Sequence, residues 1–350
     1  MSLLSWLGLG PISAKDDTRC LCPSQESIAI IEKAEAAVNQ LEDIKTQKVH
    51  SLAQIIITTH SQLLTLSHHR PDKVINDLLG NLVAVCSEIH DQDTVRQVLS
   101  YAGVQAVLPP LRKICADAES CLESHWTAHM VKGAGPDEVQ ERLKSFPYYE
   151  NYEELARLEL CAILSVTKHA PKRIAFIGSG PLPLTSLCLL DALNNGSLGS
   201  RPSHTHAHEL NQEATVILNI DCDEAAISAS LQLCLALGAP GQGMEFICTD
   251  AESPAQDLTE FDVVYMAALV GMSQTDKEDI MINIASRMRP GALMVVRSSW
   301  GLRTCLYPEV DLTTPSLLER LKPCIVVHPY GQVVNSVIVA KIRERPNCQG

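Results

Sequence analysis

Hydrophobic residues recur at helical spacing through roughly the first 135 residues of the chain. From Ser24 onward, apolar side chains return in steps of three and four, which is the period of an amphipathic helix. Ser24 is a suitable N-cap for the first of these helices, and Glu26 lies in its first turn, where the helix dipole favours an acid. Further helices are expected over about 48–67, 72–90, 93–107 and, after a break at Pro109-Pro110, 111–130.

The pattern changes after about residue 170, where short apolar runs begin to alternate with helical ones. Helices are expected over 183–193, 223–237 and 274–288. The runs that are typical of strands are 173–177, 215–220, 244–248, 261–266, 292–297, 324–328 and 333–340. This alternation predicts an α/β fold with a doubly wound, mainly parallel sheet of the Rossmann type and antiparallel pairing near its end.

The two patterns predict an N-terminal all-α helical bundle domain over 25–145 and a Rossmann-like domain over 146–342. Residues 1–24 are expected to form a flexible leader and 343–350 a tail. Residues 194–214, rich in Gly, Ser, His and Asn, are expected to be a surface insertion. Its His204-Thr-His-Ala-His208 segment could bind a metal, but a polar loop with incidental histidines is the commoner explanation.

Composition and charge exclude several classes of partner. The net charge of −13 argues against nucleic acids and anionic membranes, which select basic surfaces. No apolar stretch approaches the roughly 18 residues of a membrane span. The 13 cysteines form no CxxC pair, as is typical of reduced thiols, so a cytoplasmic protein is expected.

A glycine turn follows the first expected strand, in the segment Gly178-Ser179-Gly180-Pro-Leu-Pro183. Glycines here allow a tight turn and a close approach of the backbone to a ligand. The third glycine of the dinucleotide fingerprint is replaced by Pro183, and no Gly-Lys-Ser/Thr for a triphosphate is present. A nucleoside ligand without phosphates, such as S-adenosylmethionine, therefore fits better than NAD.

Acidic residues follow the next two expected strands. Asp221 lies 41 residues after Gly180, and removing the 21-residue insertion restores the spacing of about 20 at which an acid binds ribose hydroxyls. Asp250 could meet the adenine amine or be a loop aspartate, and Asp223 is expected to be a helix N-cap. Ala267, at the end of the fourth strand, could form the floor of the adenosine pocket or belong to the core.

A second set of candidate residues lies in the helical region. Glu119, Glu123 and Trp126 share one helix face. A carboxylate beside an aromatic ring can have a raised pKa and act as a base, although solvated glutamates on an amphipathic helix are the simpler explanation. His125 and His129 also share a face, but no third ligand is evident and no bound metal is expected.

Two arginines follow the fifth strand, in Arg297-Ser-Ser-Trp-Gly-Leu-Arg303. At this edge of the sheet a guanidinium suits a substrate carboxylate. A structural role is an equally good explanation for each of them.

Long segments of the chain closely resemble the nicotianamine synthase family, over about residues 26–341. The matching segments are Phe146-Pro-Tyr-Tyr-x-Asn-Tyr152, Ala175-Phe-Ile-Gly-Ser-Gly-Pro-Leu-Pro-Leu-Thr-Ser186, Phe261-Asp-Val-Val, Ala267-Ala-Leu-Val-Gly-Met272, Arg297-Ser-Ser, Leu306-Tyr-Pro308, His328-Pro and Val334-Asn-Ser-Val337. The resemblance implies a helical N-terminal domain packed over a methyltransferase-like Rossmann domain. It also implies an enzyme that transfers the 3-amino-3-carboxypropyl group of S-adenosylmethionine, releasing methylthioadenosine. Three molecules are joined, with closure of an azetidine ring, to make the metal chelator nicotianamine.

The resemblance also implies roles for individual residues. Leu122-Glu123-x-His125 matches the segment with the family's catalytic glutamate, so Glu123 is expected to be the base and Glu119 the next candidate. Tyr148 and Tyr149 match its tyrosine pair, and one hydroxyl would orient the amine or the substrate carboxylate.

Three other functions stay open at this point: a methyltransferase, a single-step aminocarboxypropyl transferase acting on another amine, and a non-enzymatic metallophore-binding protein. The oligomeric state also stays open, a homodimer being one option.

Overall fold

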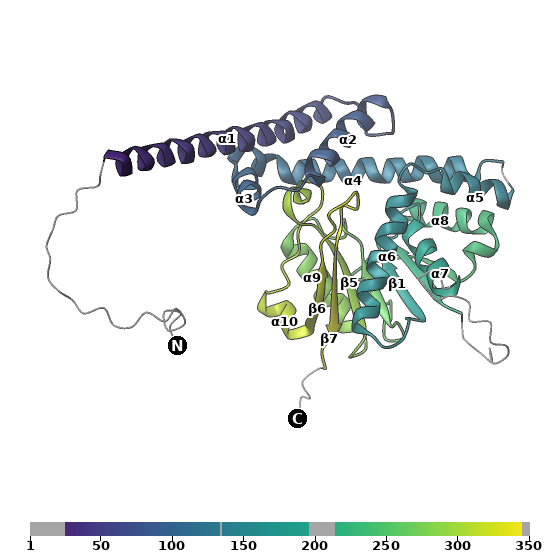
Figure 1. Ribbon diagram of the computed structural model, residues 1–350. Helices are drawn as coiled ribbons and strands as arrows, with labels where there is room; N and C mark the ends of the chain where they lie inside the picture. The colour runs from purple at the N-terminus through teal and green to yellow at the C-terminus, as the bar shows by residue number, and fades with distance from the viewer. Residues whose placement is uncertain (1–24, 134, 196–213, 345–350) are drawn as a thin grey trace, which may run out of the picture. The chain divides into compact units, whose positions relative to one another are not determined.

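The computed structural model describes residues 25–133, 135–195 and 214–344 (Figure 1). The chain divides into two compact units, Met1–Lys48 and Val49–Gly350. In the described part of the first unit the chain is helical from Gln25 to Lys48, as the N-terminal part of α1 (Gln25–Leu64). The site described below lies within the second unit. Ser24, the expected N-cap, lies outside the described residues, as do most of the expected insertion and the histidines at 204–208.

Among the described residues, six helices precede the first strand. They are α1, α2 (Lys73–Ser87), α3 (Gln92–Ser100), α4 (Ala102–Val131), α5 (Pro136–Lys144) and α6 (Tyr149–Val166). The expected all-helical composition of this region is confirmed, but the expected break near residue 47 is absent, because no Pro or Gly interrupts the helical pattern there. In the described part of the chain, no helix is long and apolar enough to cross a membrane.

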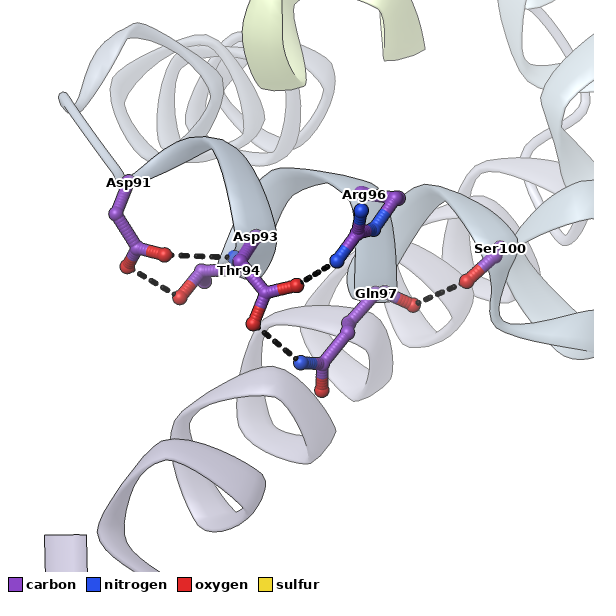
Figure 2. Close-up of polar contacts among 6 residues, drawn as sticks. All are labelled: Asp91, Asp93, Thr94, Arg96, Gln97 and Ser100. Carbon is purple, nitrogen blue, oxygen red and sulfur yellow. Dashed lines mark hydrogen bonds and ion pairs between the residues drawn. The ribbon is translucent and has the colours of Figure 1, made fainter. Parts of the chain in front are cut away.

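The short helix α3 is stabilised by its own side chains, as Figure 2 shows. The Asp91 carboxylate caps its N-terminus by accepting hydrogen bonds from Thr94 N at 2.9 Å and Thr94 Oγ1 at 2.5 Å. Asp93 accepts one hydrogen bond from Arg96 and another from Gln97 Nε2 at 2.8 Å, at the i,i+3 and i,i+4 spacings that bring side chains together on a helix. The Asp91 contacts fix the start of α3, which ends at Ser100, and α4 begins two residues later.

Helix α4 runs through Pro109 and Pro110, so the expected break there is wrong. Each internal proline costs about 3 kcal/mol because it removes a hydrogen bond and crowds the preceding turn. The helix nevertheless buries Val104, Leu111 and Ile114 in one apolar cluster with α1, α2 and the 3₁₀ turn η3 (Gly301–Cys305). This burial offsets the cost of the prolines, and the 30-residue helix continues past them to the two glutamates.

The sheet confirms the expected doubly wound α/β fold. Its seven strands lie in the order β3-β2-β1-β4-β5-β7-β6, with β1 to β5 parallel and β7 antiparallel to both its neighbours. The strands are β1 (Arg173–Ile177), β2 (Val216–Asp221), β3 (Met244–Cys248), β4 (Val263–Met266), β5 (Leu293–Ser298), β6 (Leu321–Val327) and β7 (Ser336–Ile342). The helices between them are α7 (Leu184–Asn195), α8 (Glu224–Leu237), the 3₁₀ turn η2 (Ala239–Gly241), α9 (Gln274–Arg287) and α10 (Pro315–Arg320).

Alternate residues of the central strands bury on opposite faces of the sheet. Ala175 and Ile177 of β1 join a cluster with α9 and α10, whereas Ile174 and Phe176 join a cluster with α6 and α7 (Figure 1). Because both faces are covered, the strands are apolar along most of their length, as expected for a parallel sheet. Their carboxyl ends meet at one edge.

The helices from Val49 onward share apolar cores with the α/β part of the chain. Leu302, Cys305 and Leu306 belong to the cluster of α1, α2 and α4, and α4 also packs on α8. The change from helices to strands comes at Arg173, after α6, and the compact units divide between Lys48 and Val49.

Candidate active site

The glycine turn begins directly after β1 and depends on its two glycines. Gly178 and Gly180 have φ angles of 79° and 66°, in the left-handed region that glycine adopts without strain. A Cβ atom on Gly178 would lie 2.4 Å from Val270 Cγ2, so the backbone of the turn packs too closely for a side chain. Gly180 N donates a hydrogen bond to Asp221 Oδ2 at 2.8 Å, which ties the turn to the end of β2.

A cavity of about 460 Å³ lies at this edge of the sheet. Its wall includes all six residues that the sequence analysis assigns to the cofactor: Gly178, Ser179, Gly180, Asp221, Asp250 and Ala267. Ser179 Oγ is buried and has no hydrogen-bond partner among the described residues. A buried hydroxyl without a partner is costly, so a ligand in this cavity would satisfy it.

The acidic residues at the strand ends have distinct contacts. Asp221 accepts hydrogen bonds from Gly180 N and, at 3.0 Å, from Asp223 N, and each carboxylate oxygen keeps a lone pair for a ligand. Asp223 accepts from Ala225 N at 2.8 Å and is the expected N-cap of α8. Asp250 does not end β3, which stops at Cys248, but lies in the following loop, where it accepts from Glu252 N.

The glutamates of α4 reach the same cavity from the helical side. Glu123 is only 9% exposed, and its Oε1 accepts a hydrogen bond from the Tyr152 hydroxyl at 2.7 Å. Glu119, one turn earlier, accepts one from the Tyr307 hydroxyl at 3.0 Å. Both line the cavity, so they are not solvated glutamates on an outer face.

Burial changes the acidity of both carboxyl groups. Burial above all, and then the neighbouring Glu119 charge, raise the pKa of Glu123 to about 8 against the opposing effects of the Tyr152 hydrogen bond and the Arg297 charge. Burial also raises the pKa of Glu119. A carboxyl group that titrates near neutral pH can take a proton from an ammonium group far better than an ordinary one.

The tyrosine that contacts Glu123 is Tyr152, to which the sequence assigned no role. Tyr148 is 45% exposed, packs its ring against Phe146 and lines the second cavity described below. Tyr149 lines a separate cavity between α5, α6, α7 and η2. Helix α6 starts at Tyr149, so successive residues of the motif rotate by about 100° and face different surroundings. Tyr152 belongs to the same motif, but nothing in its spacing indicates a partner 29 residues away.

The two arginines after β5 have different surroundings. Arg297 lines the cavity, and its Nε donates to Glu159 Oε1 at 2.7 Å while Nη2 donates to Glu159 Oε2 and Thr185 Oγ1. These bonds use Nε and Nη2, which leaves Nη1 for a ligand.

Arg303 is placed where it cannot reach the cavity. Its Nη2 donates to the carbonyls of Ser87 and Gly331, both at 3.1 Å, and its guanidinium lies over Trp300. The expectation that it holds a substrate carboxylate is therefore corrected to a structural role, because these backbone contacts fix it between the helical and α/β parts.

A second cavity, of about 320 Å³, lies on the other side of the glutamates. Much of its wall is apolar, with Ile75, Leu79, Leu122 and Phe146 among its residues. The residues that line both cavities are Glu119, Glu123, Tyr152, Arg297, Tyr307 and Asn335. Molecules bound in the two cavities would meet at this shared wall, beside two buried carboxyl groups.

The remaining feature concerns metals. Within residues 25–133, 135–195 and 214–344, no group of three or more His, Cys, Asp or Glu side chains is arranged to hold a metal ion.

The sequence assigned no role to three residues of the site: Tyr307, Glu159 and Asn335. Tyr307 and Asn335 nevertheless lie inside two of the matching segments, Leu306-Tyr-Pro308 and Val334-Asn-Ser-Val337, which was the one signal available.

Comparisons with known proteins agree with this arrangement. The family model for nicotianamine synthase protein matches residues 45–347. Nicotianamine synthase 2 of Arabidopsis thaliana is 32% identical over 295 residues, which cover 82% of each chain. Nicotianamine synthase of Solanum lycopersicum is 33% identical over 282 residues, covering 81% of this chain and 80% of that one.

Solved structures support the fold. The crystal structure of MtNAS in complex with MTA and tNA has a TM-score of 0.65 and 21% identity, covering 85% of this chain and 98% of that chain. A mutant of MtNAS in complex with S-adenosylmethionine matches with a TM-score of 0.65. From the family model and the plant relatives, the chain belongs to the nicotianamine synthase family.

Proposed function

We propose that this protein is an S-adenosylmethionine-dependent 3-amino-3-carboxypropyltransferase that joins three S-adenosylmethionine molecules into nicotianamine. Membership of the nicotianamine synthase family supports the reaction. The observation that carries the proposal is the wall shared by the two cavities. It offers two buried carboxyl groups where a molecule in one cavity would meet a molecule in the other.

The first cavity suits the donor. Its glycine turn allows close approach of a nucleoside, Asp221 has free lone pairs for the ribose hydroxyls, and Ser179 Oγ needs a partner. With the adenosine at this edge, the methionyl chain extends toward the shared wall and the glutamates. The second cavity then receives the molecule whose amine attacks.

The reaction requires one proton transfer for each bond formed. The attacking nitrogen uses its lone pair to bond the γ-carbon of the donor, while the carbon–sulfur bond breaks and its electron pair stays on sulfur. The sulfonium becomes the neutral thioether of methylthioadenosine, and the nitrogen gives up its extra proton. Two such steps join three molecules, and an intramolecular attack with loss of the third methylthioadenosine closes the azetidine ring.

In this scheme Glu123 takes the proton from the attacking amine. A protonated amine has no lone pair, so deprotonation is the step the protein must assist, whereas the sulfonium already provides a good leaving group. The hydrogen bond from Tyr152 fixes the carboxylate, and the position of both substrates supplies the in-line geometry. Arg297 Nη1 lies on the same wall and is available for a substrate carboxylate.

The proposal is tested by incubating the purified full chain with S-adenosylmethionine alone and measuring products by mass spectrometry. We expect three molecules of methylthioadenosine for each nicotianamine. Release of S-adenosylhomocysteine would indicate a methyltransferase instead. Methylthioadenosine formed only after addition of another amine would indicate a single-step transferase, and absence of any turnover would contradict an enzymatic role.

A further inference from the structure

Asn335 differs from the other residues of the shared wall because its side-chain amide lacks a partner. Glu119 and Glu123 are each bonded to a tyrosine, and Arg297 is bonded to Glu159 and Thr185. Asn335 is 9% exposed, and its Nδ2 is buried without a hydrogen-bond partner among the described residues. Such an unpaired donor is rare and costly in a folded protein, which points to a ligand that completes it.

The backbone around Asn335 holds this amide in a fixed place. Asn335 directly precedes β7, whose first residues pair with the end of β5: Ser336 lies opposite Ser298 and Val337 opposite Arg297. Val333 and Val337 are both buried in the apolar cluster that includes α6 and α7. Asn335 and Arg297 therefore reach the shared wall from adjacent strand ends, with little freedom to move away.

The chemistry of the wall indicates which ligand group the amide meets. An amide N–H donates a hydrogen bond, so it requires an acceptor. The two glutamates of the wall suit the ammonium of an amino acid, and the two donors that remain, Asn335 Nδ2 and Arg297 Nη1, suit its carboxylate. The wall is thus complementary to a zwitterionic α-amino acid group.

We infer that Asn335 is a specificity residue that binds the α-carboxylate of the donor's aminocarboxypropyl group at the junction of the two cavities. The inference rests on the proposed function for the identity of the donor. It gives the enzyme a means of selecting donors that carry the carboxylate.

The test measures binding of two unreactive ligands by calorimetry. S-adenosylhomocysteine carries the aminocarboxypropyl group on a thioether that cannot leave, and methylthioadenosine has a methyl group in its place. In Asn335→Ala we expect the Kd for S-adenosylhomocysteine to rise about 10- to 100-fold, the loss of one hydrogen bond to a charged group, with the Kd for methylthioadenosine unchanged. Asn335→Asp keeps the side-chain volume. It should weaken the binding of S-adenosylhomocysteine at least as much, because the new carboxylate repels the carboxylate of the ligand.

Asn283→Ala is the matched control. Asn283 also has a buried amide atom without a partner, Oδ1, but it lies on α9 outside the walls of both cavities. It should leave both Kd values unchanged. Decarboxylated S-adenosylmethionine completes the comparison, because Asn335→Ala should not weaken its binding.

Several results would overturn the inference. Equal loss of affinity for methylthioadenosine would mean a structural role. Tighter binding of S-adenosylhomocysteine to Asn335→Asp would mean that the side chain accepts from the ammonium. An unchanged Kd for S-adenosylhomocysteine in Asn335→Ala would mean that the amide does not bind the donor's carboxylate. Failure of the unaltered protein to bind S-adenosylhomocysteine would also contradict the inference. Because these measurements need no turnover, they fail or succeed independently of the product assay.

Discussion

The carboxylate of Glu123 packs directly against Gly180, so closely that a Cβ atom on Gly180 would lie 2.8 Å from Glu123 Oε2. The end of the glycine turn and the expected base, from separate parts of the chain, are thus in contact. Gly180 also has a positive φ and donates its N–H to Asp221. This one residue joins the expected nucleoside site to the expected proton acceptor.

Gly180→Ala should therefore impair both binding and turnover. The added methyl group must displace the Glu123 carboxylate, and the left-handed backbone conformation costs about 1–2 kcal/mol for a residue with a Cβ. We expect kcat to fall at least tenfold and the Kd for S-adenosylhomocysteine to rise.

Gly80→Ala provides the control, because a Cβ at this position in α2 meets nothing within 4 Å. It should stabilise the protein by about 0.5–1 kcal/mol in thermal or urea unfolding, with turnover retained. Equal kcat values for Gly180→Ala and the unaltered protein would show that Glu123 does not act from this position.

Tyr152→Phe should move the pH dependence of the reaction to higher pH. The hydroxyl donates to the Glu123 carboxylate and stabilises its charged form, so its removal raises the pKa of Glu123 above about 8. The ascending limb of kcat/KM against pH should shift upward, with most of the activity lost at pH 7 and part of it recovered at pH 9. Steady-state kinetics from pH 6 to 9.5 measure this.

Tyr149→Phe is the matched variant for that experiment, since Tyr149 lies on the same helix but lines a different cavity. A shifted profile in Tyr149→Phe and an unshifted one in Tyr152→Phe would show that Tyr152 does not set the acidity of Glu123.

Glu123→Gln should abolish turnover, retain binding of S-adenosylhomocysteine and change how stability depends on pH. Because the folded pKa of about 8 exceeds the ordinary 4.5, the folded protein holds an extra proton between these values. The contribution of Glu123 to stability is complete below pH 4.5 and is lost as pH rises to 8, by up to about 1.4 kcal/mol for each pH unit.

The amide cannot titrate, so Glu123→Gln should gain stability relative to the unaltered protein between pH 5 and pH 8. Urea unfolding at the two pH values measures the difference. A stability difference that is the same at both would show that Glu123 titrates normally. Normal turnover would move the role of base to Glu119.

Lys277→Met should loosen the loop that closes the donor cavity. Lys277 is fully buried on α9, and its Nζ donates to the carbonyls of Ala268 and Val270 at 2.8 and 2.9 Å. Val270 in turn packs against Gly178. Loss of these two hydrogen bonds should raise the Kd for methylthioadenosine several-fold, and an unchanged Kd would show that the loop holds its position without the lysine.

The same variant tests the ionisation of Lys277. Burial lowers its pKa to about 7, so between pH 7 and 10.5 the unfolded chain binds more protons than the folded one. Stability of the unaltered protein should rise with pH across this window, and Lys277→Met should lose that part of the rise. Identical pH dependence of urea unfolding in the two proteins would contradict a depressed pKa.

Much of the α/β part could be predicted because its signals are local. Strands such as 173–177 and 244–248 are short apolar runs, and Asp223 caps α8 through contacts two residues along the chain. The glycine turn and its distance from Asp221 also follow from spacing once the insertion is removed. Prediction failed at Pro109-Pro110, where burial of Val104 and Leu111 outweighs the local preference of proline.

The contacts within the site could not be predicted from local sequence patterns. Spacing placed Glu119 and Glu123 on one helix face but left open whether that face was solvated. Resemblance indicated tyrosines at 148 and 149, whereas the rotation of α6 brings Tyr152 to the carboxylate. Arg297 and Arg303 are six positions apart and equivalent as a sequence pattern, yet one reaches the cavity and the other is held by Ser87 and Gly331.

The sequence by itself determined the order of helices and strands after residue 170, the glycine turn and the family to which the chain belongs. The elements and the turn depend on hydrogen bonding and side-chain periodicity within a few residues, and the family follows from the resemblance of long segments. Only the tertiary structure decided that Glu119 meets Tyr307, 188 residues away, that Gly180 touches Glu123, and that Asn335 is left without a partner. Such contacts arise from the packing of α4 and β7 around one sheet edge, and the same packing removes the water that would otherwise keep these groups at their ordinary pKa and fully hydrogen-bonded.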